Sequence, residues 1–376
     1  MTQNRVAIQL ISTGGVYGAE RALLELAAYL HDHGWESHVV ALEGRGAAEL
    51  VARASQRGLA AEAFVPQGRL GLVPMLGRLR NLLERYPRAI VHSHGYKPDI
   101  LLSMLGAPRR LACVATCHNW ISETLRLKAW EALDKRALRK FDRIMAVSDG
   151  VHRRLLAGGV PPERIHQVSN GISPPVAGPQ ARERIRTELG LPPAARLIIQ
   201  IGRLTRSKRN DLLLEAVARL PPGLGAHVAL VGEGEQHFSL VNAARRLQLE
   251  RQVHFCGYRS DIADFLAAAD VLALTSDIEA MPIVVLEAMA ARCPIVSTKV
   301  GSVPRILQAG VECWLVAVNE VAGLAAAIDQ ALSQPSEAHS RAERAYATFV
   351  TRYSQAAMGE QYMSIYDEVW RRRGWP

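Results

Sequence analysis

The sequence predicts an α/β protein with two doubly wound domains that face a central cleft. Three observations support this prediction. The chain has 376 residues, which is too long for one core of ordinary size and suits two domains. Apolar, strand-like runs alternate with amphipathic, helix-length segments over most of the chain. The alternation is interrupted at residues 173–180 (SPPVAGPQ) and then resumes.

The first half contains the elements of one parallel sheet. Amphipathic segments at residues 19–30 and 70–85 fit helices, and Gly34 closes the first of them. Helix-length segments separate the strands, so the strands form βαβ units, which give a parallel sheet with helices on both faces. The predicted strands cover residues 6–12, 38–42, 90–93, 111–116, 143–148 and 166–169.

The second half repeats the pattern and ends in a long helical stretch at residues 338–372. Its predicted strands cover residues 197–201, 228–231, 253–256, 271–275 and 295–298. Its predicted helices cover residues 208–220, 235–249, 261–269 and 283–292. We therefore expect a first domain at residues 1–172, a linker at 173–190, a second domain at 191–350 and a C-terminal helix at 351–376.

The composition is that of a globular protein, with 49% hydrophobic and 22% charged residues. Apolar stretches such as residues 282–291 are shorter than the roughly 18 residues that a membrane span needs. The N-terminus enters an apolar strand without the features of a signal peptide. We expect a cytoplasmic protein whose five cysteines are free thiols.

Most of the net charge of +9 lies in the first half, where residues 1–172 hold 23 basic against 15 acidic side chains. Residues 123–143 (ETLRLKAWEALDKRALRKFDR) and 70–88 are basic stretches, and helical spacing in the former places Trp130, Leu133 and Phe141 near one face. Such a surface predicts an anionic partner, namely phospholipid, a lipid-linked phosphate or nucleic acid; a solvated basic face is the alternative. Aromatic residues are only 6% of the chain, which argues against nucleic acid.

Two loops with phosphate-binding chemistry follow predicted strands, at the end of the sheet where α/β proteins bind ligands. Residues 13–20 (TGGVYGAE) contain Gly14 and Gly15, which let backbone approach a phosphate or sugar closely; a tight turn is the alternative. Residues 202–208 (GRLTRSK) carry Arg203 and Lys208, which can converge on one diphosphate.

A third loop, residues 277–287 (DIEAMPIVVLE), places two carboxylates around a helix start. Pro282 suits the first helical position, so Glu279 would precede the helix and Glu287 would lie about a turn and a half inside it. A carboxylate in so apolar a helix is costly to bury unless it accepts hydrogen bonds. Sugar hydroxyls or backbone N–H groups could supply them.

Together these motifs resemble the retaining glycosyltransferases of family four. Glu279 and Glu287 form that family's E-x7-E motif, and residues 168–172 (VSNGI), 231–234 (VGEG) and 255–257 (FCG) match further motifs in the same order. The sequence departs from the pattern at 279–282 (EAMP), which lacks the usual aromatic residue. It also departs at Arg209, where glycine is usual, and at 118–120 (HNW), where H-D or H-G is usual.

The resemblance implies a GT-B fold with a C-terminal helix that crosses back to the first domain. It implies retaining transfer of a hexose-type sugar from a UDP- or GDP-linked donor to a glycan or lipid-linked acceptor, in cell-surface polysaccharide or lipopolysaccharide assembly. The protein would be cytoplasmic or peripheral on the membrane. No cofactor and no metal would be needed, and the sequence contains no Asp-x-Asp.

The resemblance also assigns roles to single residues. Arg203 and Lys208 would hold the donor diphosphate and stabilise the charge that grows as it leaves. Glu279 would bind sugar hydroxyls and Glu287 the ribose. The other implied contacts are the backbone around Met281 and Ile283 with the phosphate, Tyr258 with the base, Gly15 with the phosphate or sugar, and His118 with the C6 side of the sugar.

Two other kinds of function stay open on the sequence. One is a different GT-B enzyme, such as a sugar-nucleotide epimerase or a phosphorylase. The other is a non-enzymatic basic protein that binds membrane or nucleic acid.

Overall fold

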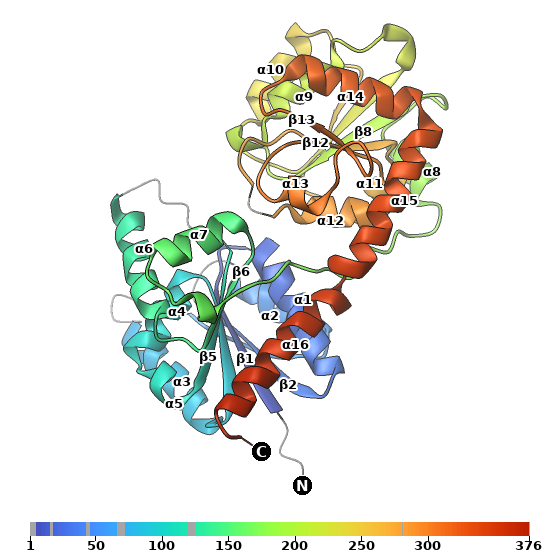
Figure 1. Ribbon diagram of the computed structural model, residues 1–376. Helices are drawn as coiled ribbons and strands as arrows, with labels where there is room; N and C mark the ends of the chain where they lie inside the picture. Colours follow the sequence, from blue (N-terminus) through green and yellow to red (C-terminus); the bar gives the residue numbers. More distant parts are fainter. Residues whose placement is uncertain are drawn as a thin grey trace. The chain divides into compact units, whose positions relative to one another are not determined.

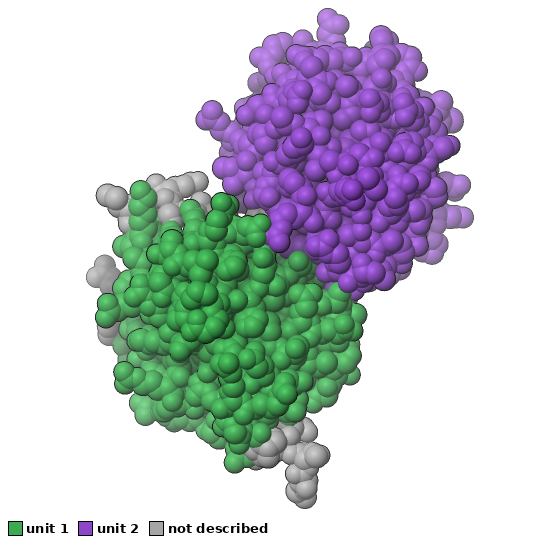
Figure 2. All heavy atoms as spheres, viewed as in Figure 1, with its two compact units in different colours: residues 1–172, 355–376 green, residues 173–354 purple. Residues whose placement is uncertain are grey.

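The computed structural model describes residues 5–15, 18–42, 46–65, 72–118, 125–279 and 281–375. The chain divides into two compact units, each with its own sheet (Figures 1 and 2). The first unit contains residues 1–172 and 355–376, and the second contains residues 173–354. Together the two sheets and their helices form the predicted α/β architecture.

The first unit is built on a parallel seven-stranded sheet in the order β3-β2-β1-β4-β5-β6-β7. Its strands are β1 (Arg5–Ser12), β2 (Trp35–Leu42), β3 (Ala60–Phe64), β4 (Ala89–His94), β5 (Ala112–Cys117), β6 (Arg143–Ala146) and β7 (Ile165–Gln167). Its helices are α1 (Gly18–Asp32), α2 (Ala47–Gln56), α3 (Leu72–Arg85), α4 (Tyr96–Met104), α5 (Ala107–Arg110), α6 (Leu125–Leu138), α7 (Asp149–Ala157) and α16 (Gln355–Arg372), with a 3-10 turn at Pro162–Arg164. The strand at the β3 edge was not predicted.

The C-terminal helix α16 packs against α1 and the sheet of the first unit. Gly359 makes this close approach possible, because a Cβ atom there would lie 2.1 Å from Cδ1 of Tyr29. The Tyr366 ring meets Trp35 edge to face, with ring centroids 5.4 Å apart. The last helix is therefore part of the first unit's core although it follows the whole second unit in sequence.

The second unit has a parallel six-stranded sheet in the order β10-β9-β8-β11-β12-β13. Its strands are β8 (Arg196–Ile201), β9 (Ala226–Val231), β10 (Val253–Phe255), β11 (Val271–Leu274), β12 (Ile295–Thr298) and β13 (Trp314–Val316). Its helices are α8 (Ala181–Glu188), α9 (Asn210–Val217), α10 (His237–Arg246), α11 (Ile262–Ala268), α12 (Ile283–Ala290), α13 (Val303–Ile306), α14 (Val321–Ser333) and α15 (Pro335–Arg352), with 3-10 turns at Arg206–Lys208 and Pro222–Leu224. The sequence did not predict β13.

Three local expectations were wrong. The helical stretch predicted at 338–372 is two helices, α15 and α16, and Gln355 at the start of α16 donates its N–H to Ile172 O at 2.9 Å. Residues 181–188 of the predicted linker form α8. The predicted apolar face does not form, because Phe141 is buried beyond the end of α6 while Leu133 is 51% exposed.

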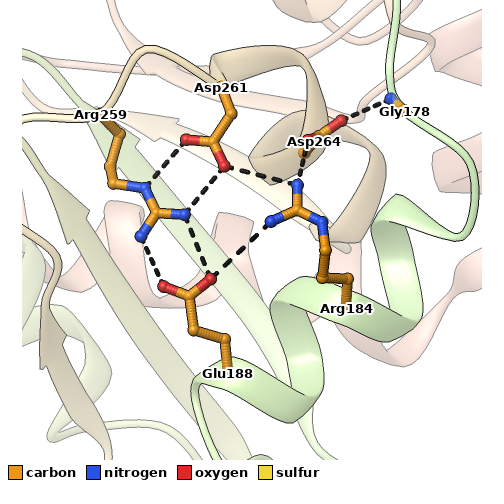
Figure 3. A network of polar contacts seen from close by, with 6 residues as sticks. All are labelled: Gly178, Arg184, Glu188, Arg259, Asp261 and Asp264. Atoms are coloured by element: carbon orange, nitrogen blue, oxygen red, sulfur yellow. Dashed lines mark hydrogen bonds and ion pairs between the residues drawn. The ribbon is translucent and has the colours of Figure 1, made fainter.

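Helix α8 is tied to α11 by an ion-pair network (Figure 3). Arg259 binds both Glu188 and Asp261, and Arg184 binds Asp264. The Asp264 carboxylate also accepts the N–H of Gly178 at 2.7 Å. This network fixes the segment after residue 173 to the second unit, which explains why it is ordered despite its linker-like composition.

None of the helices in the described ranges is long and apolar enough to cross a membrane.

Candidate functional site

Each sheet has one point where the strand order reverses, and ligands of doubly wound sheets bind outside the carboxyl ends of the strands at this point. In the second unit the reversal lies between β8 and β11, and in the first unit between β1 and β4. The loops that follow these four strands contain the motifs at 202–208, 277–287 and 13–20. The fold therefore places the three sequence motifs at the two expected binding positions.

Glycines in the second unit pack the loop after β8 against the loop after β9. Gly232 has φ 142°, and a Cβ atom there would lie 2.0 Å from Gly202 O. A Cβ atom on Gly234 would lie 2.3 Å from Leu204 O. The N–H of Leu204 donates to Glu233 O at 2.8 Å. The glycines of the 231–234 motif thus hold the 202–208 loop in place through backbone contact.

Lys208 is oriented by backbone and side-chain contacts. Its carbonyl accepts hydrogen bonds from Gln200 Nε2 at 3.0 Å and from Thr275 Oγ1 at 2.9 Å. Its Nζ lies 2.5 Å from Oε1 of Glu279, which also accepts from Ser276 Oγ at 2.7 Å. The Lys208 and Glu279 side chains are 23% and 12% exposed, so the pair is only partly solvated. The structure therefore brings together two predicted site residues from different loops.

Arg209 shows why glycine is usual after this lysine. Its backbone is left-handed, with φ 48°, a conformation that costs a side-chain-bearing residue on the order of 1 kcal/mol. The guanidinium group bonds to Asp211 and to Asn319, which stabilises the strained residue. The contacts of the Arg209 side chain therefore allow a residue other than glycine at this left-handed position.

The helix start of the E-x7-E loop is mostly buried. Met281 and Ile283 are each 8% exposed, so their apolar side chains belong to the core. Pro282 is the residue before the helix, one position earlier than predicted, with φ −74°. Glu287 is 3% exposed on α12, as expected for a carboxylate inside an apolar helix. Ala280 lies outside the described residues.

Two further predicted residues are on the surface of the second unit. Tyr258 is 67% exposed in the loop after β10, and its N–H donates to Glu233 Oε1 at 3.4 Å. Arg203 is exposed at the start of the 202–208 loop. Both side chains are accessible to a ligand.

The first unit has a cavity of about 350 Å³ at its own reversal point. The loops after β1 and β4 line it, with residues Ser12, Thr13, Gly14, His94, Gly95, Tyr96, Lys97 and Pro98. The lining from 94 to 98 was missed in the sequence, where a strand that runs into H-G-Y-K was the available signal. Gly14, a predicted site residue, therefore lines a cavity of the first unit.

Gly15 is held in place beside this cavity. Thr13 Oγ1 donates to Gly15 O at 2.7 Å, and a Cβ atom on Gly46 would lie 2.4 Å from Gly15 Cα. The predicted close backbone approach at Gly15 is thus made to another loop of the protein. Val16 and Tyr17 of the same motif lie outside the described residues.

His118 follows β5, and its Nε2 lies 3.4 Å from Nδ1 of the cavity residue His94. Burial lowers the pKa of His118 to about 4, so the imidazole is neutral near pH 7. Asn119 and Trp120 of the same motif lie outside the described residues. His118 is therefore a neutral hydrogen-bonding group next to the cavity.

Within the described ranges, no group of three or more His, Cys, Asp or Glu side chains is arranged to hold a metal ion.

Two family models match consecutive parts of the chain and together cover most of it. Residues 16–174 match the model of Glycosyltransferase Family 4, and residues 181–348 match the model of Glycosyl transferases group 1. The two parallel sheets, and the sequence motifs in the loops after their strands, agree with these matches. Together they define the class of the protein. The chain belongs to the family-four glycosyltransferases, has the GT-B fold, and is a glycosyltransferase.

Individual relatives agree with this class. The N-acetyl-alpha-D-glucosaminyl L-malate synthase of Bacillus anthracis is 25% identical over 301 residues, 79% of each chain. The lipopolysaccharide core biosynthesis glycosyltransferase LpsE of Rhizobium meliloti is 33% identical over 180 residues, 48% of this chain and 52% of LpsE. The crystal structure of Anabaena HepE in complex with UDP-glucose superposes with a TM-score of 0.83 at 23% identity, covering 96% of this chain and 99% of HepE.

Proposed function

We propose that this glycosyltransferase moves a hexose from a UDP-linked sugar to a glycan or lipid-linked acceptor, with retention of configuration and without a metal ion. The observation that carries the proposal is the contact between Lys208 and Glu279 at the reversal point of the second sheet. A cation and a hydroxyl-binding carboxylate side by side suit the junction between a diphosphate and its sugar.

The neighbouring groups fit the remaining parts of such a donor. Lys208 and the exposed Arg203 would bind the diphosphate and stabilise the leaving charge, a task that preorganised cations can perform. The N–H groups around Met281 and Ile283, at the start of α12, would add phosphate contacts. Glu287 would accept the ribose hydroxyls, and Tyr258 would lie beside the base. HepE, of the same fold, binds UDP-glucose, which supports UDP as the nucleotide.

Retention follows in this scheme from attack on the same face of the sugar that the diphosphate leaves. The acceptor hydroxyl would give its proton to the departing phosphate oxygen, while Lys208 and Arg203 neutralise the charge. His118 would contact the C6 side of the sugar.

A screen of donors tests the proposal directly. Thermal shift against UDP-, GDP- and ADP-sugars should show stabilisation by UDP-sugars, because binding to the native state raises its stability. A product assay then separates the candidate reactions, since an epimerase needs no acceptor and a phosphorylase needs free phosphate. Stabilisation by none of the three nucleotide sugars would overturn the proposal.

The acceptor side belongs to the first unit in this proposal. That unit carries the charge excess of the chain, and LpsE acts in lipopolysaccharide core synthesis. We propose that its basic surface binds anionic lipid, so that the protein acts as a cytoplasmic, peripheral enzyme of cell-surface polysaccharide assembly. Each basic residue near such a surface contributes up to about 1 kcal/mol.

Several cations of the basic stretch already have protein partners, which limits how strong the lipid attraction can be. Lys135 pairs with Glu131 at 2.7 Å, and Arg139 Nη2 donates to Gly158 O at 2.6 Å. Sedimentation with vesicles of graded anionic lipid content, at low and high salt, tests the point. We expect salt-sensitive binding that increases with anionic lipid, and binding that ignores lipid charge would contradict it.

A further inference from the structure

A line of buried polar side chains runs through the first unit from α16 to His118. Each member hydrogen-bonds to the next, and the line crosses β1, β4 and β5. We call it the polar chain. Its members, in order of contact, are Tyr362, Thr116, His92, Tyr366, Gln9, His94 and His118.

The contacts in the half nearer α16 are short. Thr116 Oγ1 lies 2.9 Å from Tyr362 Oη and 2.8 Å from His92 Nε2. His92 Nδ1 lies 2.7 Å from Tyr366 Oη. These four residues are each at most 3% exposed, so water does not replace a missing partner there.

The other half leads to the cavity. Gln9 joins the halves, with Nε2 3.0 Å from Tyr366 Oη and Oε1 3.0 Å from His94 Nε2. His94 Nδ1 then lies 3.4 Å from His118 Nε2. His94 lines the cavity, and His118 is partly exposed at the end of the polar chain.

All three imidazoles are neutral near pH 7. Burial lowers the pKa of His92 and of His94 well below the usual value, and lowers that of His118 to about 4. A neutral imidazole has one N–H and one bare nitrogen, so each internal histidine donates on one side and accepts on the other. The amide of Gln9 does the same. A hydroxyl can accept from both neighbours, but its own hydrogen then needs another acceptor.

The number of hydrogens decides which direction is favoured. The seven members carry eight hydrogens, and one N–H of Gln9 takes no part in the six contacts whichever way its amide faces. Seven hydrogens therefore remain for six contacts, so one of them also stays outside the polar chain. With Gln9 Oε1 toward His94, that hydrogen belongs to a buried hydroxyl near Tyr362 that has no further acceptor among the described residues. Leaving a buried donor unpaired is unfavourable.

Rotating the Gln9 amide by half a turn exchanges its oxygen and nitrogen within the same volume. Tyr366 then donates to Gln9, Gln9 donates to His94, and every buried hydroxyl and imidazole hydrogen of the polar chain has an acceptor. The remaining hydrogen is on Nδ1 of His118, which is partly exposed and can meet water or a ligand.

We propose that Tyr366 is a positioning residue whose hydroxyl sets His118 as the tautomer with hydrogen on Nδ1, so that His118 offers a hydrogen-bond donor to the sugar. The part that concerns the sugar rests on the proposed function. A donor at this position fits a hydroxyl, ring oxygen or carboxylate of the transferred sugar, and disfavours a group that can only donate. The C-terminal helix thus contributes to sugar recognition without touching the sugar.

Two tyrosines of α16, one helical turn apart, provide a matched pair of variants. Tyr366→Phe removes the bridge between His92 and Gln9, so neither orientation of the amide is favoured. Tyr362→Phe removes only the end of the polar chain, and Thr116 can still donate to His92. Tyr366→Phe should therefore allow both tautomers of His118, and Tyr362→Phe should keep the wild-type tautomer.

The tautomer is measured by nitrogen NMR of the full chain labelled on histidine, at neutral pH. The His118 signals are those lost in His118→Gln. We expect a protonated Nδ1 in the wild type and in Tyr362→Phe, and a mixture of tautomers in Tyr366→Phe. A bare Nδ1 in the wild type, or an unchanged spectrum of Tyr366→Phe, would overturn the proposal.

If Tyr366→Phe does not fold, Gln9→Met interrupts the polar chain at the neighbouring position and should give the same mixture. Titration with UDP-glucose and UDP separates this proposal from the proposed function. We expect Tyr366→Phe to weaken UDP-glucose about 2- to 10-fold with UDP unchanged, the effect of one neutral hydrogen bond. A changed tautomer with unchanged UDP-glucose affinity supports the role of Tyr366 and contradicts the sugar contact of His118.

Discussion

Replacing Lys208 by methionine should weaken nucleotide binding far more than replacing Arg206, an exposed cation of the same loop. The Lys208 side chain is 23% exposed and its carbonyl is held by Gln200 and Thr275, so the ammonium group is already placed before a ligand arrives. A hydrogen bond to a charged group contributes about 1.5–3 kcal/mol. Taking about 2 kcal/mol for this partly exposed position predicts a loss of roughly 30-fold in affinity for UDP.

Replacing Glu279, the partner of Lys208, should have the opposite effect on the affinity for UDP. Glu279 lies 2.5 Å from Lys208 Nζ, so its negative charge opposes a diphosphate bound there. In Glu279→Gln the amide oxygen can still accept from Lys208 and Ser276, but the repulsion is gone. We expect UDP to bind a few-fold more tightly, as for a pair worth up to about 1 kcal/mol, and the preference for UDP-glucose over UDP to fall.

Isothermal titration with UDP and with UDP-glucose, at two ionic strengths, measures both effects. Arg206→Ala is the matched control, because Arg206 is an exposed cation two residues away in the same loop. A Lys208→Met protein that binds UDP as well as the wild type would refute the assignment of Lys208 to the diphosphate. Equal losses of UDP affinity in Lys208→Met and Glu279→Gln would refute the opposed roles.

Glu287→Ala should weaken nucleotide binding by on the order of 1–3 kcal/mol with the fold intact, and unchanged affinity in a titration would exclude the ribose contact. Transfer should continue in EDTA, because Arg203 and Lys208 are proposed to neutralise the diphosphate; restoration of a dead enzyme by magnesium or manganese would contradict this. The first unit should lose stability as the pH falls below about 6.5, the unfolded pKa of histidine. The buried His92 has a lowered pKa, so the unfolded chain takes up a proton that the native state refuses. The free energy of unfolding should fall by up to about 1.4 kcal/mol per pH unit for each such histidine. Urea unfolding followed by tryptophan fluorescence at a series of pH values measures it, and a free energy that does not change below pH 6.5 would contradict the prediction.

Much of the fold was predictable because local sequence patterns report local burial. Eleven strands were expected, and each has a counterpart in one of the two sheets. The runs are apolar because central parallel strands are covered on both faces. The two strands that were missed, β3 and β13, are at sheet edges, where β3 is only partly buried and β13 has three residues. Edge strands need less apolar sequence, so the pattern is weakest there.

The order of the motifs predicted the positions of the site loops for the same reason. A loop that follows a parallel strand lies at the carboxyl edge of its sheet, wherever the strand falls in the order. Residues 202–208 and 277–287 could therefore be assigned to one edge from sequence. Their assignment to neighbouring strands, β8 and β11, needed the strand order, which depends on crossover connections that no local pattern encodes.

By itself, then, the sequence determined the two parallel sheets, the break near residue 173 and the family motifs, because each is written in a contiguous stretch of residues. Only the tertiary structure decided that Lys208 meets Glu279, 71 positions away, and that Gly359 of α16 packs closely against Tyr29. It also decided that Tyr366 and Gln9, separated by 357 positions, join one hydrogen-bonded line to His118. Such contacts depend on which surfaces pack together, and packing is a property of the whole chain rather than of any segment.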